Sequence, residues 1–156
     1  MRLSLRRIVL SAAVALFAIV GCSRPSVPAD ALNADGTLRL SEHEVSLSPD
    51  SFDQVFAGDL PVLVDFSAGW CQPCLEAQPE VKAIAEKRRD LLRVAIADMT
   101  AMADAPAARY AIEWEVEGFP AFLLFDPEGN EIVRSEGLPI EPLADWIDAG
   151  LARIAE

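Results

Sequence analysis

Unbroken apolar runs along the chain predict the strands of a sheet. The stretch PVLVDFSA at residues 61–68 is interrupted only by Asp65, as expected for a strand buried on both faces. LLRVAIAD at residues 91–98 has the same character and predicts a second strand. PAFLLFDPEGNEIVRSEG at residues 120–137 predicts two strands, because DPEGN supplies the residues of a turn. TLRLSEHEVSL at residues 37–47 alternates over a shorter length and predicts one or two strands more.

Helical spacing of apolar residues predicts four helices. At residues 73–89 the apolar side chains share one stripe and the charged ones lie elsewhere. Residues 48–58 start with a serine cap and a proline and end in glycine, which is typical of a short helix. A helix around residues 103–112 is disturbed by Pro106. The inner stripe of a C-terminal helix consists of Leu143, Trp146, Ile147, Leu151 and Ile154.

The order of these elements predicts a single α/β domain. A strand, a helix and a strand in succession require a right-handed crossover and parallel pairing, whereas the hairpin adds antiparallel strands. We therefore expect a central mixed β-sheet flanked by helices on both faces. The stretch DFSAGWCQPCLEAQP at residues 65–79 places Cys71 and Cys74 where the first central strand ends and its helix begins. In open α/β sheets this end of the strands is where chemistry is usually placed.

The N-terminal segment has the order of a bacterial export signal. Arginines precede an apolar run from Ile8 to Val20 that is too short to span a membrane. The letters IVGC at its end resemble the lipobox of bacterial lipoproteins, in which the cysteine, here Cys22, is lipidated. The alternative is an ordinary signal peptide with an incidental cysteine. The expected organisation is a lipoprotein signal peptide at residues 1–21, a lipid-anchored flexible tether at 22–40 and the folded domain at 41–156.

Acidic residues dominate the charge of the chain. It has 13 basic and 25 acidic residues and a net charge of −12, and removal of the signal segment would take three arginines and no acid with it. Such a surface repels nucleic acid and anionic lipid headgroups. We therefore expect no nucleic-acid partner, and we expect the membrane tether to be the lipid.

Cys71 and Cys74 admit three interpretations: a structural disulfide, a metal site or a redox pair. A two-residue spacer closes too small a loop for a structural disulfide to stabilise much. Zinc requires four ligands, and beyond this pair the chain has one histidine, His43, and no second cysteine pair, so a metal site would need carboxylates or another chain. We therefore expect no metal. A helix N-terminus stabilises an anion, which favours Cys71 as an attacking thiolate. Cys74 lies one turn further in and is suited to resolve a mixed disulfide.

Four motifs in one order resemble the thioredoxin family. WCQPC at residues 70–74 resembles the active site of that family, and Asp65 resembles its buried aspartate. Pro79 resembles the proline in its active-site helix, and GFP at residues 118–120 resembles its loop with a cis proline. The resemblance covers residues 45–155. It implies the thioredoxin fold, a redox-active disulfide between Cys71 and Cys74, and no cofactor.

Asp65 is expected to act with the cysteines as a third catalytic group. A carboxylate inside a buried strand has a raised pKa and is suited to exchange a proton with Cys74. The alternative is an aspartate at a strand end that reaches solvent. The lysine that many thioredoxins place nearby is absent, with Ile96 or Ala97 in its position. Burial is therefore expected to tune Asp65 more than a cation does.

Five residues are expected to contact the substrate: Trp70, Gln72, Pro73, Phe119 and Pro120. Trp70 is expected beside the sulfurs, limiting their access to water, or as a plain core residue. A cis bond at Pro120 would expose the backbone of Phe119 to an extended segment, and an ordinary trans proline is the alternative.

The acids Glu113, Glu115 and Glu117 run up to this loop and are either a solvated turn or a means of selecting basic partners.

Within the family, residues 91–132 resemble the C-terminal periplasmic domain of DsbD-type thiol:disulfide interchange proteins, in an acid followed by x-T-A and in the hairpin. Gln78 departs from that pattern, which has an acid there. Phe119 and Ala121 depart from the β-branched residue and the threonine that many thioredoxin-family members place before and after the cis proline. The resemblance implies an envelope protein-disulfide reductase facing the periplasm, with disulfide-containing envelope proteins as clients and a membrane electron donor of thiol:disulfide interchange type. Ser23 slightly favours the outer membrane. The alternatives are a thiol oxidase or isomerase, and a non-enzymatic binding or assembly factor.

Overall fold

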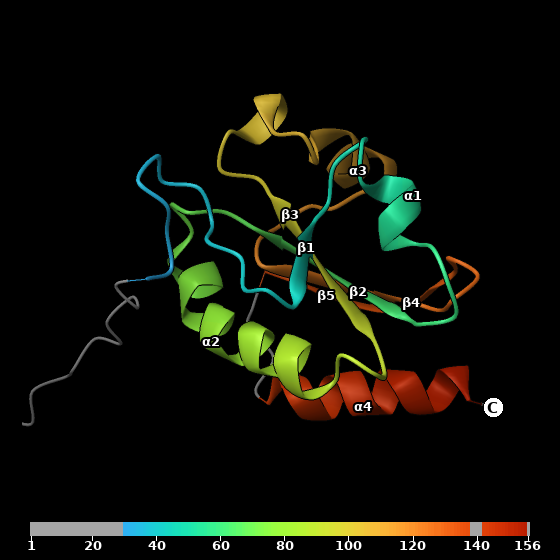
Figure 1. The fold of residues 1–156 in the computed structure, drawn as a ribbon. Coiled ribbons are helices and arrows are strands. Elements are labelled where there is room, and N and C mark those ends of the chain that lie inside the picture. The colour runs from blue at the N-terminus through green and yellow to red at the C-terminus, as the bar shows by residue number, and fades with distance from the viewer. Residues whose placement is uncertain (1–29, 138–141, 156) are drawn as a thin grey trace, which may run out of the picture.

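A five-stranded mixed sheet forms the centre of the protein, whose computed structural model describes residues 30–137 and 142–155 (Figure 1). The strand order is β1-β3-β2-β4-β5. The first three of these are parallel, β4 is antiparallel to β2, and β5 is antiparallel to β4, as the order of elements predicts. The strands are β1 (Glu44–Ser46), β2 (Val62–Ser67), β3 (Arg93–Asp98), β4 (Ala121–Phe125) and β5 (Glu131–Glu136).

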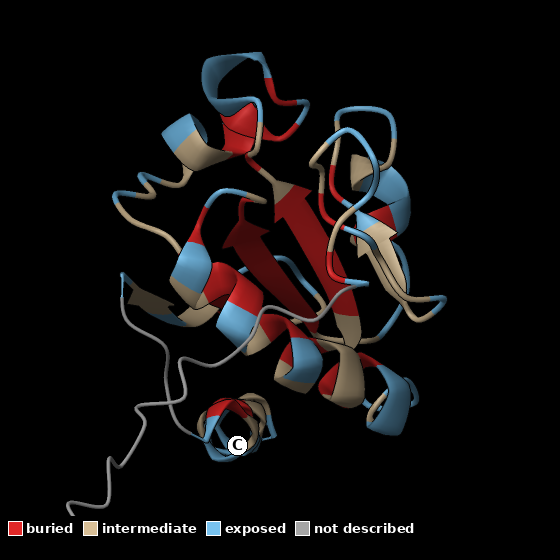
Figure 2. Cartoon of the chain, turned by 90° about the vertical axis from the view of Figure 1, so that its left-hand side faces the viewer, coloured by how far each residue is buried: buried red, intermediate tan, exposed pale blue. Residues whose placement is uncertain are grey.

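Helices cover both faces of this sheet (Figure 1). The helices α1 and α3 pack on one face around an aromatic cluster, and α2 and α4 pack on the other around aliphatic side chains. Figure 2 shows the buried central strands between helices that each expose one side. The helices are α1 (Phe52–Val55), α2 (Gln72–Lys87), the 3₁₀ helix η1 (Met102–Asp104), α3 (Ala108–Glu113) and α4 (Leu143–Ile154).

Two helices differ from the sequence prediction. The one expected at residues 103–112 is split into η1 and α3, because Ala105 before Pro106 is extended (ψ 141°), as the proline ring requires. The helix expected from residue 48 starts at Phe52. The Ser51 hydroxyl bonds to the backbone before the helix, donating to the Ser46 carbonyl at 2.6 Å, and so stabilises a turn there.

Residues 30–40 pack onto the folded domain, whereas the sequence predicts a flexible tether at residues 22–40. Ala31 and Leu38 are buried in the aliphatic core, and the Leu38 amide donates to Asp98 Oδ2 at 2.8 Å. The carbonyl of Gly36 lies so close to Gly69 that a Cβ there would be 2.0 Å from it. Leu38 and Leu40 alternate with polar residues, so their side chains share one face of the segment, and this face packs onto the domain. The folded domain thus begins by Asp30, while the predicted signal peptide and Cys22 lie outside the described residues.

Candidate redox site

Cys71 caps the N-terminus of α2. Its backbone is extended (ψ 104°), and its Sγ accepts a hydrogen bond from the Cys74 amide at 3.3 Å. The amides of a first helical turn have no partner inside the helix, and the helix dipole is positive there. Both effects stabilise negative charge on sulfur, so the local structure supports Cys71 as the attacking thiolate.

Cys74 lies in the first turn of α2 and forms a disulfide with Cys71. Cys71 is 7 % exposed and Cys74 is 1 % exposed, which is the order expected for an attacking and a resolving sulfur. Gln72 and Pro73 occupy the turn between them. Gln72 is exposed and donates to Glu76 at 3.0 Å, whereas Pro73 is half-buried and needs no amide partner at the start of a helix.

Asp65 is buried in the middle of β2, so the alternative of a solvent-facing aspartate is wrong. It lies two residues after Leu63 in the strand and therefore faces the same side of the sheet, the side covered by α2. Burial raises the pKa of Asp65 to about 7, because the charged form loses its hydration. A carboxyl group with that pKa can exchange protons at neutral pH.

Two neighbours of Asp65 adjust this pKa. The Ser67 hydroxyl donates a hydrogen bond to Asp65 Oδ1, which favours the charged form, and the negative charge of Glu44 opposes it. Ile96 lies opposite Asp65 in the β2–β3 pairing, where an apolar residue offers no counter-charge. Burial is the largest of these effects on the pKa, as expected from the missing lysine.

Thr100 fixes the loop that precedes the cysteines. Its hydroxyl donates to Asp98 Oδ1 and accepts from the Gly69 amide at 2.8 Å, and its carbonyl accepts from Trp70 Nε1 at 3.1 Å. Asp98 also accepts the Leu38 amide, so this chain of bonds joins the N-terminal segment to the redox loop. The D-x-T pattern after β3 was visible in the sequence, but its link to Gly69 and Trp70 depends on the fold.

Trp70 is 55 % exposed, so the alternative that it is a plain core residue is wrong. Its ring lies edge-on to Phe119, with 6.1 Å between centroids. Phe119 packs against the core cluster that includes Cys71 and Cys74. Trp70 and Phe119 therefore bring the cysteine loop and the Gly118–Pro120 loop together, and the Phe119–Pro120 peptide bond is cis, as the resemblance implied.

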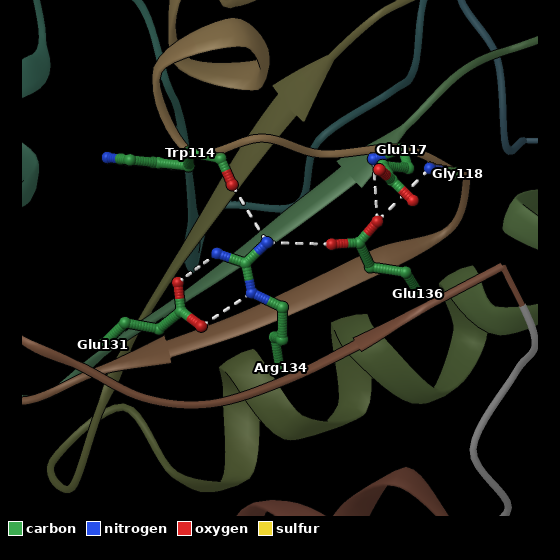
Figure 3. Close-up of polar contacts among 6 residues, drawn as sticks. All are labelled: Trp114, Glu117, Gly118, Glu131, Arg134 and Glu136. Carbon is green, nitrogen blue, oxygen red and sulfur yellow. Dashed lines mark hydrogen bonds and ion pairs between the residues drawn. The ribbon is translucent and has the colours of Figure 1, made fainter.

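The Gly118–Pro120 loop is held by the edge strand β5 (Figure 3). Glu136 Oε2 accepts the amides of Glu117 and Gly118 at 2.8 and 3.3 Å. Arg134 in turn donates to Glu136 at 2.9 Å, to the Trp114 carbonyl at 2.9 Å and to both oxygens of Glu131. These carboxylates raise the pKa of Arg134 above its ordinary value, with Glu131 contributing most.

Sequence reasoning assigned no role to Ser67, Thr100, Arg134 or Glu136. Ser67 follows Asp65 by two residues and so faces the same side of the strand, a signal that was available. Arg134 and Glu136 gave no such signal, because they lie far along the chain from the loop that they hold.

No group of three or more histidine, cysteine, aspartate or glutamate residues is arranged to hold a metal ion in residues 30–137 and 142–155. Over the same ranges, no helix has the length and apolar character that crossing a membrane requires.

Comparison with known proteins agrees with this geometry. A family model described as Thioredoxin matches residues 43–149. Thioredoxin of Pseudomonas aeruginosa is 32 % identical over 72 % of this chain and 100 % of its own length, and thioredoxin of Mycolicibacterium smegmatis is 38 % identical over 60 % and 80 %. The structure of spinach chloroplast thioredoxin F has the same fold, with a TM-score of 0.57 and 24 % identity over 69 % of this chain and 92 % of that one. The chain thus belongs to the thioredoxin family of cofactor-free thiol:disulfide oxidoreductases, which use a redox-active cysteine pair.

Proposed function

We propose that this protein is a lipid-anchored protein-disulfide reductase of the bacterial envelope. The observation that carries the chemistry is the position of Cys71 as the cap of α2, with the more deeply buried Cys74 behind it and Asp65 buried in the adjoining strand. The resemblance of residues 91–132 to the periplasmic domain of DsbD-type reductases supports the reducing direction. The lipobox at Cys22 supports the anchor and the compartment.

The reaction starts with attack of the Cys71 thiolate on a disulfide of a client protein. A bond forms between Cys71 Sγ and one client sulfur, and the other client sulfur leaves as a thiolate and takes up a proton. Asp65 accepts the Cys74 proton, and the Cys74 thiolate attacks Cys71 Sγ and breaks its bond to the client. The second client sulfur leaves as a thiolate and takes up the proton from Asp65. The client gains two electrons and two protons, and the Cys71–Cys74 disulfide remains. A membrane dithiol donor of the thiol:disulfide interchange type would reduce it again.

A Cys74→Ala variant tests the reaction, because without the resolving sulfur the mixed disulfide persists. Expressed in bacterial cells and purified under denaturing, non-reducing conditions, it should carry client proteins that mass spectrometry identifies. The Cys71→Ala/Cys74→Ala variant is the control and should carry none. If the single variant trapped no more than the control, the protein would be a non-enzymatic binding or assembly factor.

A redox titration tests the direction. A reductase should have a potential near that of thioredoxin, about −270 mV, whereas a value near −120 mV would make the protein an oxidase. An intermediate value near −180 mV, with activity in reshuffling scrambled disulfides, would indicate an isomerase.

The anchor is tested by fractionation of cells that make the wild-type chain or Cys22→Ala. Wild type should incorporate labelled fatty acid and sediment with membranes, and with outer membranes if Ser23 directs sorting. Cys22→Ala should incorporate none. Equal labelling of the two chains would exclude lipidation at Cys22.

A further inference from the structure

An apolar groove continues from the redox site between η1 and α3. It has a volume of about 510 Å³, and Phe119 lines it together with Met99 and Val116. Phe119 also touches Trp70 in the cysteine loop, so the groove and the redox site are continuous. A segment of a client bound across Phe119 would therefore extend into the groove.

Large apolar side chains are exposed along this groove. Met102 is 51 % and Ile112 is 80 % exposed, and both line it. Among the described residues, four large apolar side chains are exposed: Met102, Ile112, Trp70 and Leu91. Trp70 lies against Phe119, which also lines the groove. A local concentration of exposed apolar area of this kind is typical of an interaction surface.

The lip of the groove carries negative charge. Glu115 and Glu117 line it with exposed carboxylates, and no ion pair joins either one to a cation in the part of the chain that the structure describes. Glu113 on the adjoining turn lies 3.9 Å from Arg109. The lip thus complements a cationic side chain next to an apolar one.

We propose that this groove selects client disulfides whose flanking segment carries an apolar side chain beside a lysine or arginine. The apolar side chain contacts Met102 and Ile112, and the cation lies against Glu115 and Glu117. This inference rests on the proposed disulfide exchange and names the segment that the exchange prefers. Because the carboxylates are exposed, their attraction is screened by salt and acts largely on the rate of encounter.

The test uses two peptides that differ in one residue, Leu-Lys-Cys and Leu-Glu-Cys, each with its cysteine in a mixed disulfide with thionitrobenzoate. The purified full chain is reduced beforehand, and release of the coloured thiol in a single turnover gives the second-order rate constant. The lysine peptide should react about tenfold faster at low salt, as two exposed ion pairs allow, and about twofold faster at high salt. Equal rates for the two peptides would overturn the proposal.

Substitutions locate the preference. Glu115→Gln/Glu117→Gln should lower it to about twofold, whereas Glu86→Gln/Glu128→Gln, at exposed acids outside this groove, should keep it. Ile112→Ala and Met102→Ala should slow both leucine peptides, and Leu91→Ala serves as the exposed apolar control. A preference that survives in Glu115→Gln/Glu117→Gln would place the selection elsewhere and overturn the proposal.

The small disulfide of dithionitrobenzoate, which has no flanking segment, separates disulfide exchange from client selectivity. If the reduced wild-type chain cannot cleave it, the proposed disulfide exchange fails. If the chain cleaves it at a normal rate but treats the two peptides alike, the exchange stands and the selectivity fails.

Discussion

The redox site has two halves that are held in place in different ways. In the reaction half, residues 65–74, each reacting group is positioned by the element that carries it: Asp65 by β2 and Cys71 by the start of α2. In the half proposed to recognise clients, residues 114–120, called the recognition half below, the backbone is held by Arg134 and Glu136 of β5. In the function proposed above, the reacting groups are thus placed by the elements that carry them, with Thr100 bracing the loop before the cysteines, whereas docking depends on contacts from another strand. Client choice could then change while the cysteine chemistry stays the same.

The largest expected effect concerns Asp65 and should leave recognition untouched. Its pKa rises from 3.8 to about 7 on folding, so the folded protein binds this proton more tightly than the unfolded chain. The stability that the proton contributes is present below pH 4 and is lost as the pH rises to about 7, by about 4 kcal/mol. Asp65→Asn has no carboxyl group to titrate. Between pH 4 and pH 8, its free energy of unfolding should therefore rise by about 4 kcal/mol relative to that of wild type.

Urea unfolding of the disulfide form at both pH values measures this difference. Asp90→Asn, at an exposed turn, is the control and should run parallel to wild type. Parallel curves for Asp65→Asn would contradict the raised pKa. Peptide preference should be the same in wild type and Asp65→Asn, which separates the two halves.

The second effect tests the close approach of the N-terminal segment to the reaction half. In Gly69→Ala, the new Cβ would meet the Gly36 carbonyl at 2.0 Å, so residues 30–40 must shift. We expect a loss of about 1–3 kcal/mol in the free energy of unfolding and faster protease cleavage in that segment. Gly118→Ala in the recognition half is the matched control, because its nearest neighbour would be 3.5 Å away. Equal cleavage of both variants would show that the segment is not fastened at Gly69.

The third effect tests the hydrogen bond within the reaction half. Ser67→Ala removes the donor that favours the charged form of Asp65, so the Asp65 pKa should rise further, by on the order of one unit. Titration of the Asp65 carboxyl carbon by NMR measures this shift. An unchanged or lower pKa would mean that Ser67 does not stabilise the carboxylate.

The smallest effect belongs to the recognition half. Glu136→Ala leaves the Glu117 and Gly118 amides without their acceptor, so the second-order rate constant for peptide disulfides should fall about three- to fivefold. The rate with dithionitrobenzoate should not change, since the cysteines keep their positions. Glu131→Ala removes another partner of Arg134 without touching the loop and is the control. A parallel loss with both disulfides would show that the two halves are not independent.

The sequence predicted the reaction half well because its signals are local. An apolar strand interrupted by Asp65 and a cysteine at a helix start are patterns of adjacent residues, and both were confirmed. The support of the recognition loop could not be predicted, since Arg134 and Glu136 are ordinary residues of a hairpin strand until the fold brings them to Gly118. The expected tether failed at Leu38, because the composition of a segment does not show whether its apolar residues find a surface to pack against.

With the lipid proposed on Cys22, the packing of residues 30–40 onto the domain would also limit where the protein can work. Ala31 is buried in the core and lines a pocket together with Gln78 and Pro79 of α2, so the chain is fixed to the domain from Ala31 on. With a lipid on Cys22, as proposed, the chain up to Asp30 reaches at most about 30 Å even when fully extended. The redox site would then stay close to the membrane surface. Clients would be selected by the distance of their disulfide from the membrane as well as by their sequence.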